Sequence, residues 1–283
     1  MFLPLYKIGD MKMCEEELKL KKVQYQKRCY IGRILGILGC IILLCGCIWV
    51  VLQKKEIHSR PMEMWSDEFV SKENFLGQEN KKINVEPILQ NPELPTGCEA
   101  TAGAMILKGY GYRTDKIQVA EQIKKVPMEE KNGRYYAPHP NKAFIGDPSS
   151  TSSYGAFPHV LAEAVQNVID MQQGEHIARE LYGYSEEEIL NMVDNGIPVC
   201  IWTSMYDLEI EYKRGWYVKK DGEYSDEYFL WPSNEHVCVL TGYDEDSVTV
   251  CDPLVGVCEY PKESFFRHYE QMGHYAMILE KRK

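Results

Sequence analysis

The sequence lacks the patterns that mark several classes of protein. Its formal net charge is −10 and its C-terminal two-thirds contain no basic stripe, which argues against a nucleic-acid partner. No cysteines or histidines have the spacing of a zinc site, so the sequence implies neither a metal nor a cofactor. It also contains no internal repeat and no low-complexity tract. With 45% apolar residues, the chain can instead form a packed core.

One long uncharged run is present near the N-terminus. Residues 34–52 are 19 residues without a charge, enough to cross a bilayer as a transmembrane helix. Lysines and arginines are concentrated before this run, so the positive-inside rule predicts that residues 1–33 are cytoplasmic and that the rest is exported. A cleaved signal peptide and a lipoprotein signal ending at Cys47 are alternatives. The long charged N-terminal region and the apolar continuation to Leu52 favour an uncut anchor in the cell membrane.

After this run, we expect a stalk over residues 53–82 and one folded domain over residues 83–283. The first half of the domain has helical patterns and the second half has strand patterns, which predicts an α+β fold with a helical half followed by an antiparallel sheet. Segments 127–156 and 206–233 lack periodicity, and we interpret them as loops that wall a cleft.

Local signals place most of these elements. Asp115 can cap a helix that reaches residue 123, an apolar stripe covers residues 157–168, and Ser185 with Glu188 forms a capping box. A last helix is predicted to begin at Pro261. The predicted strands are residues 197–203, 236–243, 247–251, 257–260 and 275–279. The turn at residues 244–246 makes the second and third of them a hairpin.

Five cysteines fall in the part that we expect to be exported: Cys98, Cys200, Cys238, Cys251 and Cys258. An odd number is expected if Cys98 stays free. Export permits disulfides among the others. Cys200 and Cys238 lie in apolar runs, however, and there they equally fit small buried hydrophobic residues.

Cys98 is the most informative of these residues. It follows a Thr-Gly turn and opens the apolar run 100–107, which places its thiol at a helix N-terminus, where the helix dipole favours a thiolate. His236 and Asp252 follow in the order of a papain-type enzyme. The separation of 138 residues between Cys98 and His236 is within the roughly 130–150 of such enzymes.

These residue types predict nucleophilic catalysis on a carbonyl carbon. Cys98 would attack as a thiolate, His236 would form the imidazolium and protonate the leaving amine, and Asp252 would orient the ring. The backbone N–H of Cys98 and a side-chain amide would form the oxyanion hole. Gln90 is the best candidate for that amide, with Asn91 as the alternative.

The run 90–101 resembles the start of peptidase-like domains related to family thirty-nine of the cysteine peptidases, which includes the bacteriocin-processing leader peptidases of the papain clan. Further similar runs are 196–202, 235–244 and 250–256, so the resemblance spans about 85–279. It implies a papain-like cysteine peptidase fold with Cys98 as nucleophile, His236 as base, Asp252 as orienter and Gln90 in the oxyanion hole. Gln90 stands eight positions before Cys98, two more than in leader peptidases.

The expected context differs from that of leader peptidases, which are fused to a transporter and face the cytoplasm. We expect a membrane-anchored bacterial hydrolase with an extracytoplasmic domain, acting on exported peptides or cell-wall cross-links. Acyl transfer through the same thioester is an alternative. A second alternative is a non-catalytic module that binds a peptide or a cell-wall fragment in a papain-like cleft.

Overall fold

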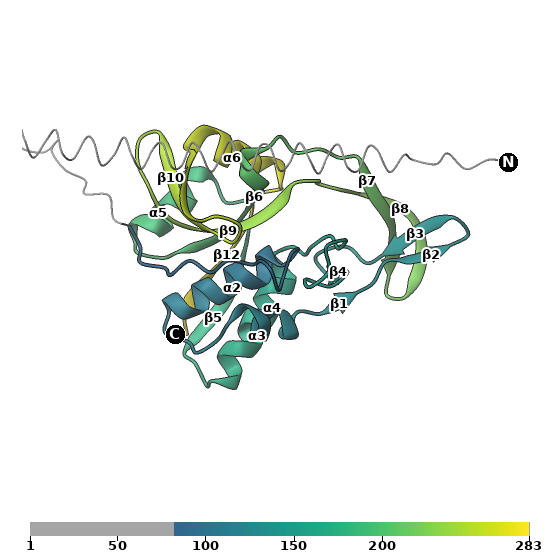
Figure 1. The fold of residues 1–283 in the computed structure, drawn as a ribbon, viewed down its shortest axis with the longest axis horizontal. Helices are drawn as coiled ribbons and strands as arrows, with labels where there is room; N and C mark the ends of the chain where they lie inside the picture. The colour runs from purple at the N-terminus through teal and green to yellow at the C-terminus, as the bar shows by residue number, and fades with distance from the viewer. Residues whose placement is uncertain (1–81, 283) are drawn as a thin grey trace, which may run out of the picture. The chain divides into compact units, whose positions relative to one another are not determined.

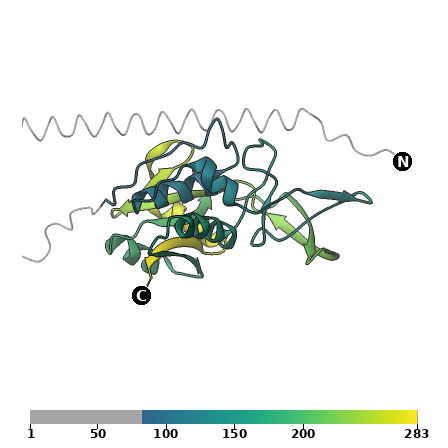
Figure 2. The same ribbon diagram turned by 90° about the horizontal axis from the view of Figure 1, so that it is seen from below.

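The structure is a computed structural model that describes residues 82–282. Helices pack on both faces of a central sheet, and a smaller sheet projects to one side (Figures 1 and 2). The helices are α2 (Cys98–Gly109), α3 (Lys116–Gln122), α4 (Pro158–Met171), α5 (Glu186–Asp194), α6 (Lys262–Gln271) and the 3₁₀ helix η2 (Met205–Asp207).

The central sheet has six strands in the order β11-β10-β9-β6-β12-β5, and every neighbouring pair is antiparallel. Its strands are β5 (His176–Tyr182), β6 (Val199–Ser204), β9 (Glu235–Tyr243), β10 (Ser247–Asp252), β11 (Gly256–Pro261) and β12 (Tyr275–Lys281). The central strand β6 is buried along its whole length, and β9 is buried up to its last residue. Their continuous apolar runs are therefore explained by cover on both faces.

The first cover is the layer of α2, α3 and α4, which contact one another, while α2 also contacts β9 and β6. Gly103 allows the close approach of these helices, because a Cβ at this position would lie 2.9 Å from Cδ1 of Leu161 and 3.1 Å from Cγ2 of Val165. The second cover is α5 and α6, on the other side of the sheet in Figure 1. Helix α2, which begins at Cys98, is thus one of the best-buried elements of the fold.

The smaller sheet consists of β2 (Glu129–Lys131), β3 (Arg134–Ala137), β7 (Arg214–Lys220) and β8 (Glu223–Trp231), in that order. A separate short parallel pair joins β1 (Lys125–Val126) to β4 (Phe144–Ile145). The prediction that 127–156 and 206–233 are loops was therefore wrong for these strands. The physical reason is that β3 and β7 pair in parallel across a long sequence separation, with Tyr136 opposite Tyr217, and no local pattern encodes such a pairing.

The local predictions elsewhere were confirmed. The Asp115 side chain caps α3 by accepting from the N–H of Gln118, and Ser185 and Glu188 form the capping box of α5. The hairpin is β9–β10, and the last helix follows Pro261. The sheet is antiparallel as predicted. Strand β5 was not predicted.

The expected anchor at residues 34–52 and nearly all of the expected stalk lie outside the described residues. Among residues 82–282, no helix has the length and apolar character needed to cross a membrane. The five cysteines among residues 82–282 are all buried, which fits the interpretation of Cys200 and Cys238 as small hydrophobic residues.

Candidate active site

Cys98 is the first residue of α2, as the sequence predicted, and only 6% of it is exposed. The turn before it is tight, because a Cβ on Gly97 would lie 2.7 Å from Cβ of Leu94. The hydroxyl of Thr96 donates to the carbonyl of Ser150 at 2.9 Å, which fastens this turn to a distant loop. The position of the nucleophile candidate is therefore set by packing as well as by the helix.

His236 and Asp252 are brought together as the sequence predicted. Nε2 of His236 lies 2.9 Å from Oδ1 of Asp252, and both side chains are almost completely buried. The hairpin positions them, because β9 and β10 are neighbouring antiparallel strands. With Nε2 occupied by the carboxylate, Nδ1 is the ring nitrogen left for a reacting group.

Asp252 is held as a carboxylate by several donors. Its oxygens also accept from the Tyr260 hydroxyl at 2.6 Å and from the N–H of Leu254 at 2.7 Å. Burial by itself would raise the pKa of Asp252. The charge of His236 and the hydrogen bonds outweigh it, so the pKa lies below its usual value.

The thiol of Cys98 does not have the partner that the sequence predicted. Its Sγ lies 3.4 Å from Oε2 of Glu99, and the N–H of Val237 also faces it. Within the described part of the chain, no hydrogen bond joins Cys98 to His236. The helix N-terminus also does not set the pKa of the thiol: burial raises it well above its usual value, and the charges of Glu99 and Glu235 raise it further.

Strand β9 brings these residues together at its N-terminal end. Glu235 and Val237 point to the face that α2 covers, where Val237 shares the apolar core with Cys98. His236 lies between them, opposite Thr203 of β6, and is near enough to Glu99, the neighbour of Cys98, to oppose the rise in the pKa of Glu99. The nucleophile candidate and the base candidate therefore lie near the same end of this strand.

Two buried acids next to the site were not assigned a catalytic role from the sequence. Glu99 is completely buried, and its Oε1 accepts from the N–H of Ala156 at 2.6 Å. Glu235 is 6% exposed, and its Oε1 has no hydrogen-bond partner. Burial raises the pKa of both carboxyl groups, and for Glu235 the neighbouring Glu99 adds to the effect. The signal available in the sequence was that each acid adjoins a predicted catalytic residue.

Gln90 is buried and lies at the edge of this site. Its N–H donates to the carbonyl of Pro253 at 2.8 Å, which places it beside the end of β10. Its Nε2 donates to the carbonyl of Pro95 at 2.8 Å, while Oε1 has no partner. The alternative, Asn91, is exposed. The burial of Gln90 and its contact with the segment before Cys98 favour Gln90 as the side-chain amide near the nucleophile.

Lys116 holds the segment that carries Gln90, and the sequence had not singled it out. Its Nζ donates to the carbonyls of Leu89 and Gln90 at 2.6 Å and 2.9 Å and pairs with Glu93 at 2.6 Å. The side chain of Lys116 is only 12% exposed. The ammonium group of Lys116 thus links α3 to the segment that precedes Cys98.

Comparison with known proteins identifies the domain. Residues 82–277 match the Peptidase_C39 like family. The chain belongs to this family. It is 26% identical over 191 residues to the uncharacterized protein YvpB of Bacillus subtilis strain 168, with 67% of this chain and 71% of YvpB covered.

The family assignment agrees with a solved structure. A crystal structure of a Bacillus anthracis protein assigned as a C39-like peptidase is 31% identical, with a TM-score of 0.62, and covers 73% of this chain and all of that one. A double-glycine-motif protease of an AMS/PCAT transporter, solved with its leader peptide, is 17% identical with a TM-score of 0.40, over 71% and 94% of the two chains. This second structure is thus much less similar to the chain than the first. The Peptidase_C39 like domain here thus has the mixed α/β fold of its C39-like relative.

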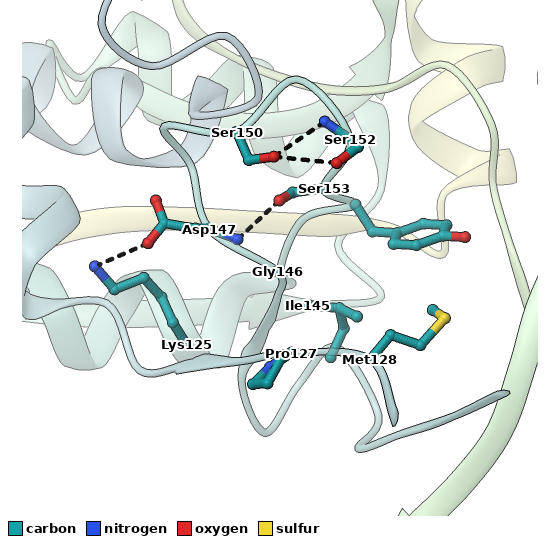
Figure 3. A pocket seen from close by; sticks show the side chains of 10 residues that line it. Lys125, Pro127, Met128, Ile145, Gly146, Asp147, Ser150, Ser152 and Ser153 are labelled. Atoms are coloured by element: carbon teal, nitrogen blue, oxygen red, sulfur yellow. Dashed lines mark hydrogen bonds and ion pairs between the residues drawn. The ribbon is translucent and has the colours of Figure 1, made fainter. Parts of the chain in front are cut away.

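A pocket of about 440 Å³ is built on the loop that leads from β4 to α4 (Figure 3). Lys125 and Asp147 form an ion pair on one side at 3.7 Å, and Met128 lies on another side. Tyr154 also lines the pocket. The same loop accepts the hydrogen bond from Thr96 described above. The pocket therefore adjoins the turn that precedes Cys98.

Proposed function

We propose that this protein is a cysteine peptidase in which Cys98 is the nucleophile, His236 the general acid and base, and Asp252 the residue that orients the imidazole. The observation that carries the proposal is the buried pair of His236 and Asp252, because His236 lies on β9, the strand whose backbone N–H at Val237 faces the thiol of Cys98. The assignment of the chain to the Peptidase_C39 like family supports it.

The chemistry follows from these positions. The resting site holds a protonated thiol, because burial and two acids disfavour the thiolate. When a peptide enters, Nδ1 of His236 would accept the thiol proton as Sγ attacks the carbonyl carbon, and the imidazolium would then protonate the leaving amine. Water then attacks the resulting thioester: His236 accepts a proton from this water and passes it to the departing sulfur, which restores the thiol and releases the acyl part as a carboxylic acid. Asp252 stabilises the imidazolium throughout.

The oxyanion formed in the attack requires donors. The backbone N–H of Cys98, which has no partner within its own helix, is the first candidate. Gln90 is the second, since its amide lies at the segment before Cys98. To donate to an oxyanion, this amide would use the hydrogen of Nε2 that does not bind the Pro95 carbonyl.

The proposed location is the outer face of a bacterial cell membrane. The support is the 19-residue uncharged run at residues 34–52, with basic residues concentrated before it. The proposed substrates are exported peptides or cell-wall peptides, and the pocket beside Thr96 offers room for one substrate side chain. A reporter fused after residue 283 distinguishes the two sides of the membrane: an outward C-terminus supports this location and a cytoplasmic one excludes it.

The test of the activity uses the full chain with a peptide mixture and a cell-wall digest, followed by mass spectrometry of the products. Cleavage by the wild type, with loss in Cys98→Ala and in His236→Ala, supports a peptidase. A covalent thioester trapped in the wild type but absent in Cys98→Ala identifies the nucleophile. Products joined to an added amine would indicate acyl transfer by the same intermediate.

A second function is favoured by one specific observation. The thiol contacts Glu99 rather than His236 in the described structure, and its pKa is raised rather than lowered. A non-catalytic module that binds a peptide or cell-wall fragment would show this arrangement without any need for a thiolate. Tight binding of such a fragment with no cleavage, unchanged in Cys98→Ala, would establish that function instead.

A further inference from the structure

Three groups that can ligate a metal ion meet at the N-terminus of α2. Sγ of Cys98 and one carboxylate oxygen each of Glu99 and Glu235 all lie within 4.8 Å of one another, and all three residues are buried. Two belong to α2 and the third begins β9. The catalytic proposal uses only the thiol, which leaves the two acids without a role.

Oxygens of both carboxyl groups lie close to the thiol. Oε1 of Glu99 is held by the N–H of Ala156, which leaves Oε2 facing the thiol at 3.4 Å. Oε1 of Glu235 is buried and has no hydrogen-bond partner, and only 6% of the residue is exposed to solvent. A buried carboxylate oxygen ordinarily has a donor or a cation beside it.

Gly155 keeps the space between the two acids open. A Cβ at this position would lie 2.7 Å from Oε1 of Glu99 and 3.0 Å from Oε2 of Glu235. Any side chain there would press on both carboxyl groups. The backbone of Gly155 does not have a positive φ, so conformational freedom is not what requires a glycine here.

We propose that Cys98, Glu99 and Glu235 bind a thiophilic divalent cation such as Zn²⁺, which blocks the nucleophile. Zn²⁺ accepts both thiolate sulfur and carboxylate oxygen, whereas Ca²⁺ and Mg²⁺ prefer sites made of oxygen alone. On binding, the metal–sulfur bond replaces the S–H bond and the thiol proton leaves to solvent, with no change of oxidation state. Three protein ligands leave a fourth position of the tetrahedral ion for water.

The blocking role rests on the proposed peptidase function, but the binding does not. When the sulfur atom of Cys98 is bound to zinc, it has no lone electron pair directed at a substrate carbonyl, so the ion and a substrate compete for Cys98. Removal of the ion by a chelator would release the nucleophile. The site would therefore make the enzyme sensitive to the local concentration of free zinc.

The test measures protection of one residue from alkylation and needs no substrate. The full chain is treated with a chelator, exchanged into metal-free buffer at constant pH, and incubated with iodoacetamide at increasing Zn²⁺. Peptide mapping then reports alkylation at Cys98 alone, so that the cysteines before residue 82 do not contribute. The variants are Glu235→Gln and Glu99→Gln, which keep the shape of each side chain, and Glu186→Gln, an exposed acid on α5, is the matched control.

We expect Zn²⁺ to protect Cys98 in the wild type and in Glu186→Gln at the same concentration. Glu235→Gln should raise the half-protecting concentration by at least about tenfold, the loss typical even of groups that merely support a ligand. Glu99→Gln still accepts from the N–H of Ala156 and should show a similar loss. Equal protection in all four proteins, or none in the wild type, overturns the proposal.

A second measurement does not depend on the folding of the acid variants. Cd²⁺ added to the wild type should produce an ultraviolet thiolate-to-metal band, and part of it should disappear in Cys98→Ser. A band that is identical in both proteins overturns the site. Cleavage of peptides without zinc protection would overturn this inference alone, whereas zinc protection without any peptide cleavage would leave the site standing and overturn the peptidase proposal.

Discussion

Asp252 offers a sharp quantitative test of the structure. It is completely buried and accepts from three donors, namely the ring of His236, the hydroxyl of Tyr260 and the N–H of Leu254. Asp252→Ala removes the acceptor that these three donors share. Removing one member of a buried charged pair costs about 3–5 kcal/mol, and we expect a loss of unfolding free energy in this range.

Asp252→Asn should cost much less, because it keeps the shape and one acceptor oxygen. That oxygen can still accept from His236 and Leu254, and the Tyr260 hydroxyl can rotate to accept from the new amide. What is lost is the charge of the acceptor. A hydrogen bond to a charged group contributes about 1.5–3 kcal/mol, and one between neutral groups contributes about 0.5–1.5 kcal/mol. Each of the bonds from His236 and Leu254 therefore weakens by about 1 kcal/mol, which predicts a total loss of about 2 kcal/mol.

The measurement is urea unfolding of the full chain followed by tryptophan fluorescence. With a slope of roughly 2 kcal/mol per M, the midpoint should fall by about 1.5–2.5 M in Asp252→Ala and by about 1 M in Asp252→Asn. A midpoint of Asp252→Ala equal to that of the wild type would show that the carboxylate does not hold these donors. An Asp252→Asn variant that is less stable than Asp252→Ala would lead to the same conclusion.

The same variants carry a pH prediction. The pKa of Asp252 is lower in the folded protein than in the unfolded chain, so its contribution is complete above the unfolded value of about 3.9 and is lost as the pH falls through the folded value. The stability difference between the wild type and Asp252→Asn should therefore shrink in strong acid. A difference that stays constant down to that range would contradict the lowered pKa.

Three further changes test other parts of the molecule. Gly103→Ala should destabilise the domain by about 1–2 kcal/mol in urea unfolding. The cost of overpacking between α2 and α4 should exceed the gain in helix propensity of about 1 kcal/mol. A stabilised variant would contradict the close packing of these helices. Lys116→Met should lower the melting temperature by about 4–8 °C, because it removes the charged donor to two backbone carbonyls, and it should slow any peptide cleavage by displacing Gln90. An unchanged melting curve would show that Lys116 does not hold the segment that carries Gln90. His236→Ala should reduce the rate of peptide cleavage by about 10²–10⁴ while peptide binding to Cys98→Ala remains measurable; a smaller loss would mean that His236 is not the base.

Much of the secondary structure follows from the sequence because its signals are local. Asp115, Ser185 and Glu188 cap α3 and α5 through contacts within one helical turn. The turn at residues 244–246 and the apolar runs beside it specify the β9–β10 hairpin. The Thr-Gly turn before an apolar run likewise predicts that a helix begins at Cys98. Each of these patterns is complete within a few residues, so no tertiary information is needed to interpret it.

The smaller sheet and the surroundings of the thiol depend on contacts that only the folded chain makes. Tyr136 and Tyr217 pair across two segments that each look irregular alone. The helix start at Cys98 suggested a lowered thiol pKa, but the fold buries the thiol and places two acids beside it, and desolvation outweighs the helix N-terminus. The sequence by itself determined which residues could perform the chemistry and on which elements they lie. The tertiary structure decided which of them meet and in what dielectric environment, because burial and strand register are properties of the whole packed domain.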